Sequence, residues 1–185
     1  TSTLQQEASQ RFSFTPKRTM YIAQKLYEGI EIGNEGHVGL ITYMRTDSVR
    51  IAPEGLAEAT EYISHRYGSS YTLPQPRIYK TKKGAQDAHE AIRPTAIRHT
   101  PESLSRNLSP DELKLYALIW KRFVSTQMAE AVFDVLTIEI TAGRHLLQAV
   151  GNTLKFDGFT CLYTEAREET ATEESSDSVA EDGKQ

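Results

Sequence analysis

The 185-residue sequence contains a single cysteine, Cys161, so it cannot form an internal disulfide. A lone thiol without neighbouring cysteines at ligand spacing offers no structural zinc site, and we interpret it as a small buried hydrophobic residue. No stretch approaches the roughly 20 apolar residues that cross a bilayer, and no charged-then-apolar start resembles a signal peptide. The sequence therefore predicts a cytoplasmic protein with no membrane partner.

Motifs for nucleotide phosphates are also missing: there is neither a P-loop nor a dinucleotide fingerprint, and no internal repeat is evident. The length and the 38% apolar content allow one core, or one domain plus a piece of a second. The sequence begins with Thr1 rather than methionine and closes on a polar tail. We therefore interpret it as an internal piece of a longer polypeptide.

The net charge of −4 argues at first against a nucleic-acid partner, but the charge is unevenly distributed. Residues 164–185 carry eight acidic and two basic side chains, which leaves +2 on residues 1–163. This acidic tail lacks the apolar residues of a core and is expected to be a disordered linker. Residues 77–106 carry +4, which predicts a phosphate-facing surface, although a solvated basic loop is the alternative. Their basic residues are Arg77, Lys80, Lys82, Lys83, Arg93, Arg98 and Arg106.

Four segments are predicted to be helical, from the periodicity of their apolar residues, from helix-forming composition or from helix-start signals. They are residues 2–10, 17–29, 53–67 and 109–131. Ser2 or Thr3 is expected to cap the first, and Ser109 with Glu112 forms a capping-box pattern at the last. The sequence is therefore mainly helical up to about residue 131.

Strand signals are fewer. Residues 38–43 are apolar and partly β-branched, which predicts a strand, and a strand after paired helices suggests a winged-helix arrangement. Residues 68–101 contain four prolines and two glycines, typical of long loops with at most short elements. Residues 133–141 and 145–156 read as strands, and Gly143 between them predicts a hairpin. The predicted fold class is α+β: a mainly helical winged-helix domain followed by a β-hairpin.

Reactive side chains concentrate in Tyr43-Met-Arg-Thr-Asp-Ser48. A phenol has a pKa near 10, so it attacks a phosphodiester only if proton removal is assisted and the developing charge is neutralised. In an extended segment Tyr43, Arg45 and Asp47 project to the same side, so a guanidinium can sit beside the attacked phosphorus. Composition alone favours the alternative that this tyrosine packs in a core.

A second cluster is Asp87-Ala-His-Glu-Ala-Ile-Arg-Pro-Thr95. His89, when protonated, and Arg93 can both donate to a phosphate, and their spacing places them on one face if the segment forms a helical turn. The His-Glu pair lacks the second histidine of the zincin motif, which argues against zinc hydrolysis. A capped turn with solvent-exposed ion pairs is the alternative.

The segment Gly39–Ser48 resembles the active-site signature of bacterial type IA DNA topoisomerases, and Ala88–Thr95 resembles a second signature of that family, in the same order and at a similar distance. Thr1–Ser9 resembles the stretch that enters the same domain, and Phe156-Asp-Gly-Phe159 resembles a strand end of the family. The resemblance spans roughly residues 1–163.

The resemblance implies that Tyr43 is the nucleophile, which cuts one DNA strand and holds the 5′ phosphate as a phosphotyrosine. It implies that Arg45 binds the scissile phosphate, and that His89 contributes to phosphate binding with Asp47 as its hydrogen-bond partner. Catalytic roles thus fall on Tyr43, Arg45 and His89. The residues implied in DNA contact or positioning are Arg45, Asp47, Ser48, His89, Arg93 and Thr95.

Type IA enzymes also use a Toprim domain that binds Mg²⁺ and supplies an acid/base glutamate, and this sequence has no such segment. The resemblance therefore implies no metal bound by this chain, and a fragment nearly inactive alone. It further implies single-stranded DNA and the remaining domains as partners, a monomer in the bacterial nucleoid, and ATP-independent relaxation of negative supercoils. Residues 1–131 look like the family's CAP-like tyrosine domain, 132–163 like part of its arch, and 164–185 like a variable linker.

Two other interpretations remain open. The second is a winged-helix DNA-binding module without chemistry, since paired helices, a strand and a basic loop suit that function. A purely structural interaction domain is the third, and it predicts no salt-dependent binding of DNA. The first two differ at Tyr43, which forms a covalent DNA adduct only in the enzyme.

Overall fold

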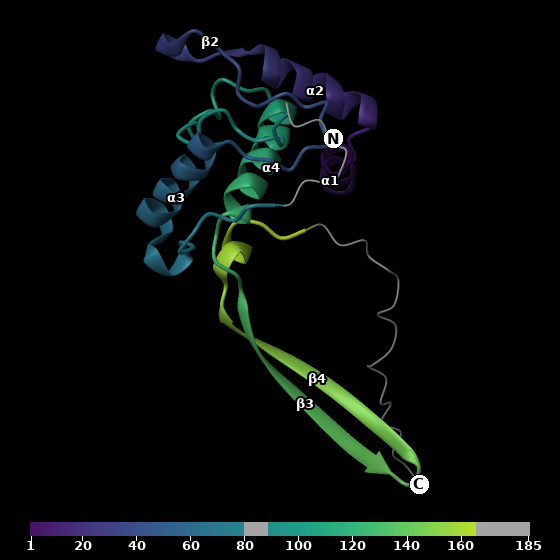
Figure 1. The fold of residues 1–185 in the computed structure, drawn as a ribbon. Coiled ribbons are helices and arrows are strands. Elements are labelled where there is room, and N and C mark those ends of the chain that lie inside the picture. The colour runs from purple at the N-terminus through teal and green to yellow at the C-terminus, as the bar shows by residue number, and fades with distance from the viewer. Residues whose placement is uncertain (80–88, 166–185) are drawn as a thin grey trace, which may run out of the picture.

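The computed structural model describes residues 1–79 and 89–165. Within these ranges the chain forms four α-helices and two small antiparallel sheets, which confirms the α+β class (Figure 1). No helix in the described ranges is long and apolar enough to span a membrane. The helices are α1 (Ser2–Phe12), α2 (Pro16–Glu28), α3 (Pro53–Tyr67) and α4 (Pro110–Thr126).

The starts of α2 and α4 carry side-chain caps, whereas α1 and α3 begin without one. The Glu112 carboxylate accepts the backbone N–H of Ser109 at 2.9 Å, as the capping-box pattern predicts. The expected caps of α1 are wrong, because the helix begins at Ser2 with Thr1 as its N-cap residue. The Thr1 hydroxyl does not cap the helix; it donates to the Met44 carbonyl oxygen at 2.7 Å. The start of α1 is thus attached to the segment that follows Tyr43.

Helix α4 runs through the centre of the helical part and anchors the loop that precedes it (Figure 1). Its Tyr116 is fully buried and donates its hydroxyl to the His99 carbonyl oxygen at 2.6 Å. Trp120 donates its indole N–H to the Ile97 carbonyl oxygen at 3.1 Å. Residues 97–99 are therefore fixed on the core, although they belong to a segment without regular secondary structure.

Two element boundaries differ from the sequence prediction. The strand expected over residues 38–43 is short: β2 (His37–Val38) pairs with β1 (Ile30–Glu31), and further along only Ile41 bridges, to Pro94. Helix α4 ends at Thr126 instead of about Ala131. There Met128 pairs with the loop after α3, through an isolated bridge to Thr72, so tertiary pairing ends the helix early.

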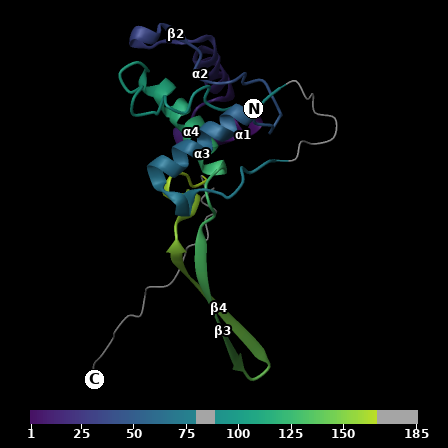
Figure 2. The same cartoon turned by 60° about the vertical axis from the view of Figure 1, so that its left-hand side comes forward.

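The predicted hairpin is confirmed as β3 (Val132–Ala142) and β4 (His145–Phe156), joined at Arg144 and a left-handed Gly143. It projects away from the helical part in both views (Figures 1 and 2). Large apolar side chains are exposed along both strands, so this ribbon buries little of its own apolar surface. They include Phe133, Val135, Leu136, Ile138, Ile140, Leu146, Leu147, Val150 and Leu154.

The root of the hairpin is fastened to the helical part. The Tyr71 hydroxyl donates to Asp157 Oδ1 at 2.7 Å, and this hydrogen bond raises the pKa of Tyr71 to about 12. The chain then enters a short 3₁₀ helix, η3 (Gly158–Cys161), where the Phe159 N–H donates to the Ala129 carbonyl oxygen at 2.9 Å. Cys161 is exposed, so its interpretation as a buried residue is wrong. It occupies the last position of η3, on the solvent side.

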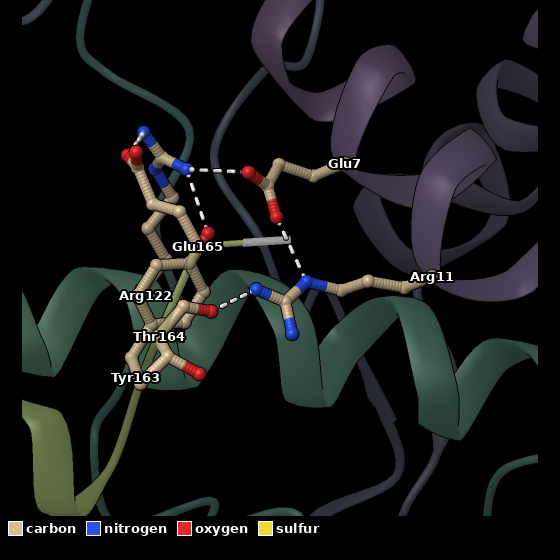
Figure 3. Close-up of polar contacts among 6 residues, drawn as sticks. All are labelled: Glu7, Arg11, Arg122, Tyr163, Thr164 and Glu165. Carbon is tan, nitrogen blue, oxygen red and sulfur yellow. Dashed lines mark hydrogen bonds and ion pairs between the residues drawn. The ribbon is translucent and has the colours of Figure 1, made fainter. Parts of the chain in front are cut away.

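A polar cluster joins α1, α4 and the segment that returns from the hairpin (Figure 3). Glu7 on α1 is buried and accepts the Arg11 Nε–H at 2.8 Å. Arg122 on α4 donates to the Tyr163 hydroxyl at 2.7 Å and lies 3.5 Å from the Glu7 carboxylate. Burial alone would raise the pKa of Glu7, but hydrogen bonds with Arg11 and Tyr163 and the positive charges nearby hold it below its ordinary value.

We expect Glu7→Gln to lower the melting temperature at pH 7 and to lose this effect in acid. A carboxyl whose pKa is depressed by folding stabilises the fold above its ordinary pKa of 4.5, and that contribution disappears as the pH falls through the depressed value. Thermal melts of wild type and Glu7→Gln between pH 7 and pH 3 measure the gap between their melting temperatures. A gap that stays constant contradicts the expectation, and Glu61→Gln on the exposed face of α3 controls for the change of charge.

Candidate active site

Tyr43 lies two residues after the bridge at Ile41, and 39% of its surface is exposed. Exposure alternates over the following residues, with three side chains buried and three exposed. The phenol, guanidinium and carboxylate of the first cluster therefore all face solvent, as their two-residue spacing predicts. The buried residues are Met44, Thr46 and Ser48, and the exposed ones are Tyr43, Arg45 and Asp47.

The two signature segments, far apart in the sequence, lie side by side. The Thr42 N–H donates to the Arg93 carbonyl oxygen at 2.9 Å, and the Thr95 N–H donates to the Leu40 carbonyl oxygen at 3.0 Å. Residues 89–95 are not helical, so the helical turn that would place His89 and Arg93 on one face does not form. Backbone groups of the second signature pair with the Tyr43 segment instead.

Two aromatic rings flank the Tyr43 ring. Tyr27, near the end of α2, meets it edge-on with 5.3 Å between ring centroids, and His89 meets it edge-on at 6.0 Å. Gly39 lets the segment before Tyr43 lie close to the backbone at the end of α2, because a Cβ at residue 39 would lie 2.7 Å from the Tyr27 carbonyl oxygen. The structure therefore brings His89 and Tyr43 together from separate segments.

A cleft of about 1090 Å³ lies beside these rings. The start of α1, the segment after Tyr43, residues near His89 and one face of α4 line it. Arg45, Asp47 and His89 all contribute to the lining, and Tyr43 adjoins it through its contact with His89. Within the described residues no hydrogen bond joins Asp47 to His89, so the expected pair does not form in this structure.

The remaining predicted site residues face other surroundings. Ser48 is buried and its hydroxyl accepts the Arg50 N–H at 3.2 Å. The Arg93 guanidinium pairs with Glu90 at 2.8 Å and packs against Gly55 at the start of α3. The exposed Thr95 donates its hydroxyl to the Gly39 carbonyl oxygen at 2.7 Å. These three side chains hold the two segments and their neighbours in place.

Several arginines of the basic stretch 77–106 form ion pairs. Arg77 pairs with Glu130 at 3.2 Å, and Arg98 pairs with Glu35 at 3.3 Å. Lys80, Lys82 and Lys83 lie outside the described residues, as does most of the acidic tail. The expected phosphate-facing surface thus stays a prediction, and three of its described arginines, Arg77, Arg93 and Arg98, have carboxylate partners.

The profile of the DNA topoisomerase family matches residues 1–184. The chain belongs to this family. The fold is also similar to full-length topoisomerase I from Thermotoga maritima, with a TM-score of 0.76 and 37% identical residues. That match covers 95% of this chain and 28% of the Thermotoga maritima chain. Both comparisons confirm the resemblance to bacterial type IA topoisomerases, of which this chain spans only a part.

Among the described residues of this topoisomerase chain, no group of three or more histidine, cysteine, aspartate or glutamate side chains is placed to hold a metal ion. The family resemblance implies a Mg²⁺ site in a Toprim domain and not in these residues, and we assign them no metal-dependent step.

Sequence reasoning missed two side chains that contact the site. Tyr27 lies against the Tyr43 ring, and Thr1 holds the Met44 and Thr46 backbone through its hydroxyl. Nothing local identifies Tyr27, because it is one tyrosine of an amphipathic helix. The Thr1 hydroxyl, which donates to one backbone group and accepts from another, cannot be told from an ordinary helix-start residue in the sequence. Both are found only once the topoisomerase chain is folded.

Proposed function

We propose that this chain carries the strand-cutting half of a type IA topoisomerase active site, with Tyr43 as nucleophile. The observation that carries the proposal is the exposed Tyr43 phenol, held beside His89 and facing solvent together with Arg45. The Tyr43 Oη forms a bond to phosphorus as the bond from phosphorus to the 3′ oxygen breaks. The phosphate stays on the 5′ side, joined to the tyrosine.

This exchange balances without an external reactant. The phenol loses one proton, the departing 3′ oxygen gains one, and one phosphoester bond replaces another, so ATP is not needed. Reversal reseals the strand, and passage of a second strand between the two events relaxes negative supercoils. Single-stranded DNA is therefore the proposed substrate.

Arg45 and His89 are proposed to bind the scissile phosphate. Arg45 is exposed, lines the cleft, and makes no ion pair with any described residue, so its fork of donors is available to phosphate oxygens. His89, when protonated, adds a donor beside the phenol. Donors already placed where negative charge develops stabilise the transition state without reorganising.

Arg45→Lys is expected to slow formation of the covalent DNA adduct by roughly tenfold or more, because lysine keeps the charge but loses the bidentate fork. The measurement is the single-turnover cleavage rate with the rest of the enzyme supplied in trans. Arg66→Lys, at an exposed position at the end of α3, is the matched control. Unchanged cleavage by Arg45→Lys would refute the phosphate role.

The other signature residues are proposed to act mainly by position. Arg93 pairs with Glu90, Ser48 is buried, and Thr95 bonds to Gly39, which favours positioning over direct DNA contact. Asp47 is exposed in the cleft, where it can orient Arg45 or His89 once DNA is bound. None of these four is assigned a covalent step.

We propose the same domain organisation that the resemblance implies: a CAP-like tyrosine domain over residues 1–131, an arch segment over 132–163 and a linker over 164–185. The apolar side chains exposed along β3 and β4 support this assignment, because a lone two-stranded ribbon needs further strands or helices to cover them. The other domains of a type IA enzyme, Toprim among them, are the proposed partners.

The chain alone is expected to be nearly inactive, since the acid/base and metal groups belong to the Toprim domain and each lost electrostatic element costs about 10²-fold or more in rate. The test supplies a Toprim-containing portion in trans with Mg²⁺ and an end-labelled single strand, followed by denaturing electrophoresis. A covalent protein–DNA adduct is the expected result. Salt-dependent binding without any adduct would instead favour a winged-helix binding module.

A further inference from the structure

The backbone pairing between the two signatures ends in an irregular way at Thr42. In a regular antiparallel pair, the two opposed residues exchange both of their N–H···O=C bonds. Here the Thr42 N–H donates to the Arg93 carbonyl oxygen at 2.9 Å, as expected for such a pair. The return bond differs, because the Arg93 N–H donates to the Thr42 hydroxyl oxygen, also at 2.9 Å. The hydroxyl occupies the place that the Thr42 carbonyl has in a regular ladder.

The same hydroxyl makes a second bond that fixes its direction. It donates to the Ala91 carbonyl oxygen at 2.7 Å, so both its donor and one acceptor position are used. Ala91 itself donates its N–H to the Arg50 carbonyl oxygen at 2.8 Å. A single half-buried hydroxyl thus connects the Tyr43 segment to the second signature at two points, two and four residues beyond His89.

The regular backbone pairing ends at Thr42, directly before Tyr43. A side chain that replaces its own backbone carbonyl competes with regular pairing and releases the chain from it. The next residue is Tyr43, whose ring stands exposed between Tyr27 and His89. Just beyond the second signature, the Ile97 and His99 carbonyl oxygens accept hydrogen bonds from α4, so the segment that pairs with Thr42 is anchored to the core.

We propose that Thr42 is a positioning residue that fixes Tyr43 relative to His89 by means of its hydroxyl, an inference that rests on the proposed function of Tyr43. Thr42 touches no DNA in this role. Its hydroxyl holds the Ala91–Arg93 backbone against the Tyr43 segment, so that phenol and imidazole meet the same phosphate. A displacement of about 1 Å between reacting groups can cost about 10²-fold in rate, so loss of the hydroxyl should act on the rate of cleavage more than on binding.

Two substitutions separate the hydroxyl from the shape of the side chain. Thr42→Val keeps the branched shape and removes every hydrogen bond of the hydroxyl, whereas Thr42→Ser keeps the hydroxyl. In the enzyme completed in trans, Thr42→Val should slow adduct formation at saturating DNA by about tenfold to 10²-fold, with the Kd for DNA within about twofold of wild type. Thr42→Ser should stay within about threefold of wild type. Thr60→Val, which removes a hydroxyl bonded within α3, is the control.

A second measurement is independent of the cleavage chemistry. In the 185-residue chain, the Arg93 amide should exchange with solvent faster in Thr42→Val and at the wild-type rate in Thr42→Ser, and ring contacts between Tyr43 and His89 seen by NMR should weaken only in the valine variant. Wild-type cleavage or unaltered exchange and ring contacts in Thr42→Val would overturn the proposal. An equal loss of cleavage rate and of ring contacts in Thr42→Ser would also overturn it. If wild-type protein forms no adduct, the proposed function fails, while the exchange and ring measurements still decide the role of Thr42.

Discussion

Replacing Tyr43 with phenylalanine is expected to abolish the covalent protein–DNA adduct while leaving the fold and DNA binding intact. The substitution removes one oxygen atom from an exposed ring, and that ring keeps its edge contacts with Tyr27 and His89. Without the phenolic oxygen no bond to phosphorus can form, and loss of a catalytic nucleophile costs on the order of 10⁶-fold in rate. Denaturing electrophoresis of the enzyme completed in trans measures the adduct, and mass spectrometry of its peptides locates the phosphotyrosine.

Tyr27→Phe is the matched control for that experiment. Tyr27 is also exposed, and its ring centroid lies 5.3 Å from that of Tyr43, so it is an alternative phenol in contact with the Tyr43 ring. Its phenylalanine variant should form the adduct at nearly the wild-type level, because only the ring is needed to hold Tyr43. If the adduct survives in Tyr43→Phe and disappears in Tyr27→Phe, the nucleophile has been assigned to the wrong residue.

The elements that the sequence predicts well are those with local causes. Helix α3 begins at Pro53 and ends at Tyr67, as predicted, because proline at the first turn and glycine after the last residue define both ends within the segment itself. The hairpin agrees within one residue for a similar reason, since its turn and its alternation are local. Where the end of an element depends on a distant partner, as for α4 and the strand before Tyr43, the prediction fails.

The candidate site divides in the same way. Tyr43, Arg45 and Asp47 are found from one short segment, and their shared exposure follows from spacing alone. The arrangement around them is not local: Tyr27 comes from α2 and His89 from a segment that sequence patterns describe only as a loop. Arg93 shows most clearly what a sequence pattern cannot predict. Its charge suggests a phosphate ligand, whereas in the fold its guanidinium pairs with Glu90 and packs against Gly55.

The attachment of the hairpin to the helical part depends on a glycine in a left-handed conformation. Gly158 has φ +48°, and a Cβ there would lie 2.5 Å from the backbone carbonyl of Glu130. The two strands of the hairpin leave and rejoin the helical part at this point, where Phe159 N–H bonds to the Ala129 carbonyl oxygen. A side chain at residue 158 would therefore push apart the two chains that form the root of the hairpin.

Gly158→Ala is accordingly expected to destabilise the protein by about 2–4 kcal/mol, from a strained φ together with an overlap that rigid backbone cannot relieve. Gly143→Ala separates the two causes, because Gly143 also has positive φ, +61°, but has no atom within 4 Å of the added Cβ. It should cost only about 1 kcal/mol. Thermal melts should show a fall of roughly 4–16 °C for Gly158→Ala and a much smaller one for Gly143→Ala. Equal falls would mean that backbone strain alone matters, and that the close contact between Gly158 and Glu130 does not fasten the hairpin to the tyrosine-bearing part.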